Sequence, residues 1–149
     1  MSNTNTPELI EGGIAIDDRG QLIFANDFDL SAYRRFYMIS NHVDQFVRAW
    51  HGHKKEAKAI VVASGAAIVG AVAVDDWESP SSSLVPYRHV LTGKKPAVLL
   101  IPAGYANGIM TLTPDTIVCV FSSSSVEESR GDDYRFPSRL WDIWGVEER

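Results

Sequence analysis

The chain has 149 residues, 45% of them hydrophobic, and a net charge of −5, so it is long enough for one domain that buries roughly two-thirds of its unfolded surface. No basic block offsets the negative charge, which argues against general binding to nucleic acid or to a membrane, although a few local arginines can still hold a small anion. No apolar run reaches membrane-spanning length and no secretory signal is evident at the start of the sequence, so a cytoplasmic location is expected.

Residues 1–149 are expected to form a single domain, of which residues 1–8 are a disordered tail. Short β-branched and aromatic stretches, separated by glycine, proline and polar turns, predict strands along most of the chain. In order, the predicted strands are 14–16, 22–24, 34–39, a strand that carries the histidines at 51 and 53 and runs into 59–63, then 66–74, 87–91, 97–101, 108–112 and 116–121. Residues 75–86 form a long Ser- and Pro-rich loop, and only 138–144 shows weak helical periodicity. Many short strands at regular spacing predict an all-β sandwich or barrel.

The most informative stretch is Arg48-Ala49-Trp50-His51-Gly52-His53, which runs through Lys58 into an apolar strand. Two histidines one residue apart on a strand point to the same side of the sheet. Two imidazoles on one face are suited to binding a metal or moving a proton. An incidental polar pair is the plainer alternative.

The spacing of these residues resembles the cupin family, whose fold is a double-stranded β-helix jelly roll. His51-Gly52-His53, followed by Lys58 and Gly65, matches its first signature with one substitution, and 102–107 matches its second with one substitution. In cupins that bind metal, the positions of Lys58 and Asn107 hold a glutamate and a histidine ligand. An ammonium group beside a divalent ion is repelled by several kcal/mol, on the order of 332/(εr). We therefore expect no metal and no cofactor.

The same substitutions resemble the sugar-nucleotide 3,5-epimerases of the dTDP-4-dehydrorhamnose pathway, which are metal-free jelly-roll dimers. The residues that carry this resemblance are Arg48 to His51, Lys58, 101–108 and 127–129. His51-Gly52-His53-Lys54-Lys55, preceded by 34–37, also resembles the dTDP-4-keto-6-deoxyhexose 3,4-ketoisomerases. Both resemblances imply a homodimer that acts on a nucleotide sugar.

These families use a ketone at C4 of the sugar, which acidifies the protons on its neighbouring carbons. A neutral imidazole can take such a proton and return it, while a fixed cation stabilises the charge that develops on the ketone oxygen. The resemblance assigns the base to His51 and the cation to Lys58. Tyr37 matches a tyrosine near the ketoisomerase site and completes the candidate catalytic set.

Two features of the epimerases have no match. Their tyrosine after the last core strand is replaced by serines at 122–125, so Tyr37, Tyr105 and Tyr134 are the possible substitutes. The aspartate that pairs with their histidine is also missing, and either of the aspartates at 132 and 133 is a possible stand-in. A proton donor on the far face is required for inversion, so its identity stays open.

Further candidates are substrate-binding residues, of which the arginines suit a diphosphate because guanidinium grips phosphate oxygens bidentately. Each is individually as easily an ordinary surface or structural residue. These candidates are Arg34, Arg35, Arg48, His53, Tyr105 and Asn107.

The first functional hypothesis is therefore a metal-free epimerase acting at C3, C5 or both of a nucleotide-linked, dTDP-type 4-keto-6-deoxy sugar. The alternatives are a 3,4-ketoisomerase and a nucleotide-sugar-binding cupin without catalysis. A metal-dependent cupin is a third, less favoured hypothesis.

Overall fold

A computed structural model describes residues 5–149 of the chain. One five-stranded sheet contains β1 (Glu8–Glu11), β4 (Arg35–Ile39), β6 (Lys58–Ser64), β9 (Ala97–Ile101) and β11 (Ile117–Ser122). A second five-stranded sheet contains β5 (Val47–His53), β7 (Ala66–Ala73), β8 (Tyr87–Thr92), β10 (Tyr105–Thr111) and β12 (Tyr134–Arg135). The strand β1 begins inside the stretch 1–8 for which a tail is expected, and residues 1–4 lie outside the described residues.

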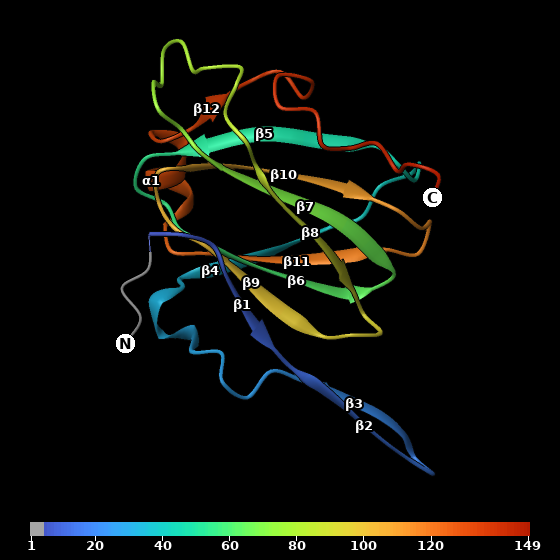
Figure 1. The fold of residues 1–149 in the computed structure, drawn as a ribbon. Coiled ribbons are helices and arrows are strands. Elements are labelled where there is room, and N and C mark those ends of the chain that lie inside the picture. Colours follow the sequence, from blue (N-terminus) through green and yellow to red (C-terminus); the bar gives the residue numbers. More distant parts are fainter. Residues whose placement is uncertain (1–4) are drawn as a thin grey trace.

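The two sheets face each other with antiparallel pairing throughout, as Figure 1 shows. The first sheet has the order β1-β9-β6-β11-β4 and the second β12-β5-β10-β7-β8, so neighbouring strands are mostly distant in sequence. Such crossing between two sheets is the arrangement of a jelly roll. The all-β expectation is confirmed.

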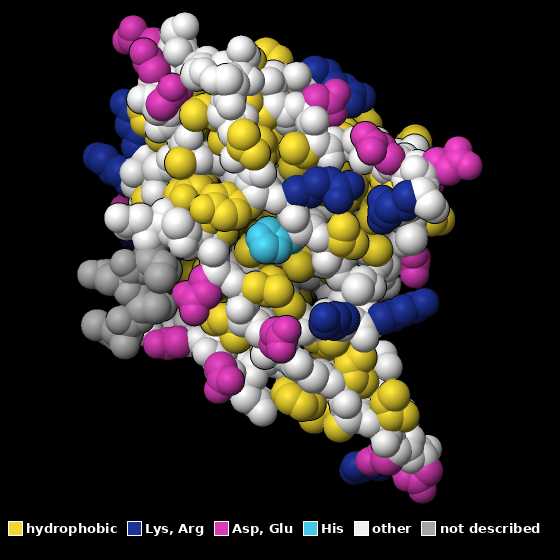
Figure 2. Space-filling model, viewed as in Figure 1, with side chains coloured by type: hydrophobic (Ala, Val, Ile, Leu, Met, Phe, Trp, Pro, Cys, Tyr) yellow, Lys and Arg dark blue, Asp and Glu magenta, His cyan; other side chains and the backbone are white. Residues whose placement is uncertain are grey.

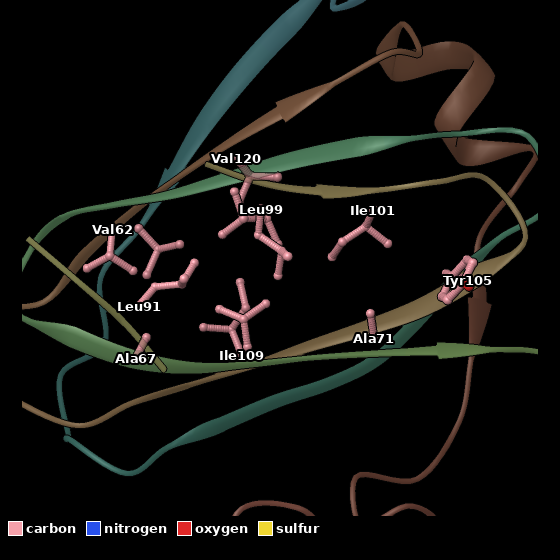
Figure 3. Close-up of a cluster of buried hydrophobic side chains, with 12 residues drawn as sticks. Val62, Ala67, Ala71, Leu91, Leu99, Ile101, Tyr105, Ile109 and Val120 are labelled. Carbon is pink, nitrogen blue, oxygen red and sulfur yellow. The ribbon is translucent and has the colours of Figure 1, made fainter. Parts of the chain in front are cut away.

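The space between the sheets is apolar at one end and polar at the other. Along β6 the inward-facing side chains change from Lys58 to Ile60 and Val62, because alternate residues of a strand share a face. Both aliphatic side chains belong to a buried cluster contributed by both sheets (Figure 3). The apolar end holds the sheets together and leaves the polar end available for a cavity.

A second apolar cluster covers the outer face of the second sheet. Trp50 points away from the space between the sheets and is fully buried, with its ring 5.5 Å from that of Trp141 and 5.2 Å from that of Trp144. Trp141 and Trp144 lie in the stretch 138–144, whose weak helical periodicity is misleading: residues 138–141 form a turn and 142–144 are irregular. The apolar residues of this stretch are spaced so that Trp141 and Trp144 both pack on Trp50.

Two short helical segments occur in the described residues, a 3-10 turn η1 (Leu30–Ala32) and the helix α1 (Val126–Arg130). Residues 127–129 carry part of the epimerase resemblance, but no helix is predicted there from the sequence. Ser125 caps α1: its side chain accepts the backbone N–H of Glu128, while the Glu128 side chain accepts that of Ser125. This reciprocal pair is a capping box, which stabilises a single helical turn.

The strands β2 (Gly13–Asp17) and β3 (Gly20–Phe24) form a separate hairpin that projects from the body of the molecule (Figure 1). Its flanks are apolar, since Ile16 is 76% and Leu22 65% exposed. Exposed apolar side chains lie along this arm and near its base in Figure 2. Among the described residues, no helix combines the length and apolar character needed to span a bilayer.

Candidate active site

A cavity of about 600 Å³ occupies the polar end of the space between the sheets. Strands β4 and β6 of one sheet and β5 and β10 of the other supply its walls, and α1 with the segment up to β12 closes one side. The lining residues are Arg35, Tyr37, Met38, Ile39, Ser40, Arg48, His51, His53, Glu56, Lys58, Asn107, Ile109, Val126, Ser129, Arg130, Asp133 and Arg135.

The cavity brings together most of the candidate residues, although they are spread over more than seventy positions of the chain. The candidates that line it are Arg35, Tyr37, Arg48, His51, His53, Lys58 and Asn107. Arg34 lies outside, on the surface, where its guanidinium pairs with Glu128. Tyr105 also lies outside: its ring packs in the apolar cluster and its hydroxyl donates to the carbonyl oxygen of Asn5.

His51 lies between Asn107 of β10 and Arg135 of β12 in the antiparallel register of the second sheet. Burial, followed by repulsion from Arg135 and Lys58, lowers the pKa of His51 to about 4, against an opposing attraction from Asp133. The imidazole is therefore neutral at neutral pH and has a lone pair with which to accept a proton.

The ring of His53 is held by a hydrogen bond to the backbone, unlike that of His51. Its Nδ1 lies 2.6 Å from the carbonyl oxygen of Asp132, which can only accept, so Nδ1 carries the proton and donates. Its Nε2 is buried and faces Glu56, 3.4 Å from Oε2. His53 therefore shapes the cavity wall, with its ring fixed through Nδ1.

Asp132 is the anchor of the connection between β5 and β6. Its carboxylate accepts the backbone N–H groups of Lys54 (2.7 Å), Lys55 (2.8 Å) and Glu56 (3.0 Å). One side chain thus fixes the backbone that follows the histidine pair. Of the two aspartates considered as partners of His51, Asp132 serves this structural role, and only Asp133 acts on His51, through charge.

Lys58 lies on β6 opposite the histidine strand and is almost fully buried. Its ammonium nitrogen is 3.6 Å from Glu56 Oε2 and 5.9 Å from the centre of the Tyr37 ring. The Arg35 guanidinium lies 5.4 Å from the same ring centre. Tyr37 is thus flanked by two cations at the cavity wall.

Several lining residues are not among the candidates from sequence, and the polar ones include Glu56, Ser129, Arg130 and Arg135. In the sequence Glu56 is one of several charged residues between His53 and Lys58, and nothing there indicates that its side chain is buried. The capping box at Ser125 is the signal from which α1, and with it Ser129 and Arg130, was predictable. The cavity lining has two carboxylates, those of Glu56 and Asp133. It has five cationic side chains, which are Arg35, Arg48, Lys58, Arg130 and Arg135.

The glycine between the histidines is required by packing on the opposite face of β5. A Cβ atom added to Gly52 would lie 2.7 Å from the Trp77 ring and 3.2 Å from that of Phe136. Trp77 comes from the long loop at 75–86 and packs on Tyr134, with ring centres 4.9 Å apart.

We expect Gly52→Ala to lower the free energy of unfolding by about 2 kcal/mol, the usual range for overpacking. Gly145→Ala is the matched control, because no heavy atom lies within 4 Å of a Cβ added there. Urea denaturation of the two variants provides the comparison. Equal stabilities would show that Trp77 moves aside at no cost.

Among residues 5–149, no three His, Cys, Asp or Glu side chains are grouped so as to hold a metal ion. At the positions where metal-binding cupins have a glutamate and a histidine ligand, the cavity has Lys58 and Asn107. The residues present therefore do not fit that metal site.

Comparison with known proteins identifies one family and one fold. The family model described as "FdtA: WxcM-like, C-terminal" matches residues 5–136. Comparison with curated proteins gives no significant match.

Similar solved structures are epimerases and ketoisomerases. The RmlC epimerase of Mycobacterium tuberculosis is 16% identical, with a TM-score of 0.75 over 97% of this chain and 76% of that one. QdtA, a sugar 3,4-ketoisomerase from Thermoanaerobacterium thermosaccharolyticum in complex with TDP, is 18% identical, with a TM-score of 0.66 over 91% of each chain. ChmJ, a 3'-monoepimerase from Streptomyces bikiniensis in complex with dTDP-quinovose, is 17% identical, with a TM-score of 0.75 over 93% of this chain and 74% of that one. At these identities the likeness establishes the fold, and the resemblance to both groups is confirmed.

Proposed function

The chain belongs to the FdtA family (WxcM-like, C-terminal), and on that basis we propose that it is an isomerase of a nucleotide-linked, dTDP-type 4-keto-6-deoxy sugar. Three things support this proposal. Two structurally similar proteins are, by their names, a sugar 3,4-ketoisomerase in complex with TDP and a 3'-monoepimerase in complex with dTDP-quinovose. The cavity is of the size that small-molecule sites usually have. A neutral histidine and a lysine both line it.

The excess of cationic side chains suits the diphosphate of a nucleotide sugar. Arginine binds phosphate oxygens bidentately, and three of the arginines at the cavity lie on different elements, Arg35 on β4, Arg48 on β5 and Arg135 on β12. An anion held among them would be attracted from several directions. The diphosphate is therefore the part of the substrate that we expect to dominate affinity.

The chemistry requires a base and a stabilised oxyanion. A ketone at C4 makes the proton on C3 acidic, and we expect neutral His51 to remove it. The negative charge moves to the ketone oxygen, where the Lys58 ammonium stabilises the enolate more than the ketone. Tyr37, beside Lys58, is the remaining proton-carrying group of the catalytic set.

Of the two isomerisations, we propose the 3,4-keto shift, which the structure after the last core strand supports best. At 122–125, where the epimerases place their acid, Ser122 and Ser124 are buried and hydrogen-bonded to each other, and Ser125 caps α1. In a keto shift His51 takes the C3 proton, the hydroxyl proton on O3 is lost as O4 gains one, and the proton on His51 returns to C4. No second base or acid on the far face of the ring is needed.

The 3,5-epimerase reading remains as the second candidate, on one specific observation. Tyr37 lies on β4 of the first sheet and His51 on β5 of the second, so an acid and a base come from facing sheets. Lys58 also matches the epimerase lysine. An acid facing the base is what inversion at a carbon requires.

Incubation with dTDP-4-keto-6-deoxyglucose in heavy water distinguishes these reactions. A carbonyl moved to C3 supports the keto shift, and inversion with deuterium at C3 or C5 supports the epimerase. Binding with neither a moved carbonyl nor an inverted carbon would leave a nucleotide-sugar-binding cupin and contradict both. The rate is expected to be the same after dialysis against a chelator, because the Lys58 ammonium stands in place of a metal ligand.

The low pKa of His51 sets the acid side of the pH profile. The base must be neutral, so kcat/KM should stay level as the pH falls from neutral and decline only towards the pKa of about 4. A bound diphosphate offsets the cations that lower this pKa, so the decline of kcat should begin at a higher pH. Initial rates, with folding monitored by circular dichroism, test this. A decline of kcat/KM centred near 6.5, the ordinary value for histidine, would contradict it.

We further propose that the protein is a homodimer in which a second copy covers the apolar hairpin β2–β3. The hairpin exposes Ile16 and Leu22, and large apolar exposed surfaces usually mark interaction sites. Sedimentation velocity is expected to show a dimer for the wild type and a shift to monomer for Leu22→Lys. A monomeric wild type at micromolar concentration would contradict the proposal.

A further inference from the structure

The proposed reaction gives no role to Glu56, although its carboxylate is buried at the cavity. Its side chain is 1% exposed, and neither carboxylate oxygen has a hydrogen-bond donor in the described structure. A buried carboxylate without such partners is costly, and proteins keep one where nearby cations compensate it. Its position therefore has to be explained by the cations around it.

Two cations and one imidazole, from three different strands, surround this one carboxylate. Arg35 Nη2 of β4 lies 3.6 Å from Oε1, and Lys58 Nζ of β6 lies 3.6 Å from Oε2. His53 Nε2 of β5 lies 3.4 Å from Oε2. Because each of these side chains also lines the cavity, moving the carboxylate would alter the cavity wall on three sides.

The backbone at Glu56 is independently fixed. Its N–H is the third of the three groups that the Asp132 carboxylate accepts. The carbonyl oxygen of Asp132 also accepts the Nδ1 proton of His53. Asp132 therefore fixes both the His53 ring and the backbone of Glu56, so these two residues have little freedom to move apart.

We propose that Glu56 is a positioning residue of the cavity, whose buried carboxylate holds the Lys58 ammonium at the cavity wall and uses the His53 ring as its fixed support. The inference rests on the proposed function for the role of Lys58, which is to stabilise the oxyanion. The contact of Glu56 with His53 is independent of that role. It provides a readout that does not involve turnover.

The electrostatic surroundings of His53 make this readout specific. Burial and Lys58 lower the pKa of His53, while Glu56 and Asp132 raise it. The other titratable groups that face this contact are Arg35 and Tyr37 on β4, His51 on β5 and Tyr105 on β10. Removing the negative charge of Glu56 should therefore lower the pKa of His53 further.

The test follows the ring resonances of His53 by NMR through a pH titration. Glu56→Gln is expected to lower the pKa of His53 by about one unit, the smaller effect of an opposite charge at this distance. Glu127→Gln removes the same charge from an exposed position on α1 and should leave the titration unchanged. An identical titration in both variants would overturn the proposal.

Kinetics of the same variants test the consequence for Lys58. Glu56→Gln is expected to lower kcat about a hundredfold with a smaller change in KM, and Glu56→Asp to recover part of the loss. An unchanged kcat in Glu56→Gln would overturn the proposal. Should Glu56→Gln not fold, Glu56→Asp must give a His53 pKa below that of the wild type, and equality would overturn it. If the wild type itself shows no isomerisation, the proposed function fails, while the NMR titration still decides the role of Glu56.

Discussion

Replacing His51 by asparagine is expected to lower kcat by about a thousandfold, within the usual range for the loss of a general base. Asparagine keeps a polar side chain of similar size, but its amide cannot take up a proton. The cavity and its cations stay in place, so affinity for dTDP should change little. Initial rates with the keto sugar nucleotide, and calorimetric titration with dTDP, measure the two effects separately.

His89→Asn is the matched control for this substitution. His89 lies on β8, away from the cavity lining, and is partly buried, so the same change of side chain is made where no proton transfer is proposed. Its kcat should equal that of the wild type. An equal kcat for His51→Asn would show that the base is another group.

Asp132→Ala is expected to lower the free energy of unfolding by about 4 kcal/mol. The change removes three hydrogen bonds to a charged acceptor, each worth about 1.5–3 kcal/mol and not fully additive. It also leaves three backbone donors without a partner next to the histidine pair. Chemical denaturation, monitored by tryptophan fluorescence, measures the loss.

The neighbouring aspartate supplies the comparison. Asp133 is exposed, and its carboxylate accepts hydrogen bonds from Arg135 at the surface of the site. Asp133→Ala should therefore cost less than about 1 kcal/mol, as expected for an exposed ion pair. If both variants lose the same stability, the loop from β5 to β6 does not depend on Asp132.

Most of the fold was predictable because its signals are local. Alternation and turn residues indicate strands, and the long loop at 75–86 follows from its serines and prolines. Helix α1 was not predicted because five residues are too few to show helical periodicity. Its capping box is the one sequence feature that indicates a helix there. The apolar residues of 138–144 suggested a helix because packing on Trp50 places them at a similar spacing.

The site was predictable to the extent that two motifs carry it. Strand alternation separates the two neighbouring arginines, since Arg35 and Tyr37 face the cavity and Arg34 faces solvent. Glu56 could not be predicted because its burial depends on Asp132, seventy-six positions away. The same holds for Arg135, which reaches His51 only through the pairing of β12 with β5.

The most direct test of the account is a crystal structure of His51→Asn soaked with dTDP-4-keto-6-deoxyglucose. We expect the hexose to lie in the cavity between the sheets, with C3 about 3.5 Å from the side chain at position 51, the approach needed for reaction. The ketone oxygen should be nearest to Lys58 Nζ. A sugar nucleotide bound elsewhere, or one whose ketone faces away from Lys58, would contradict the account.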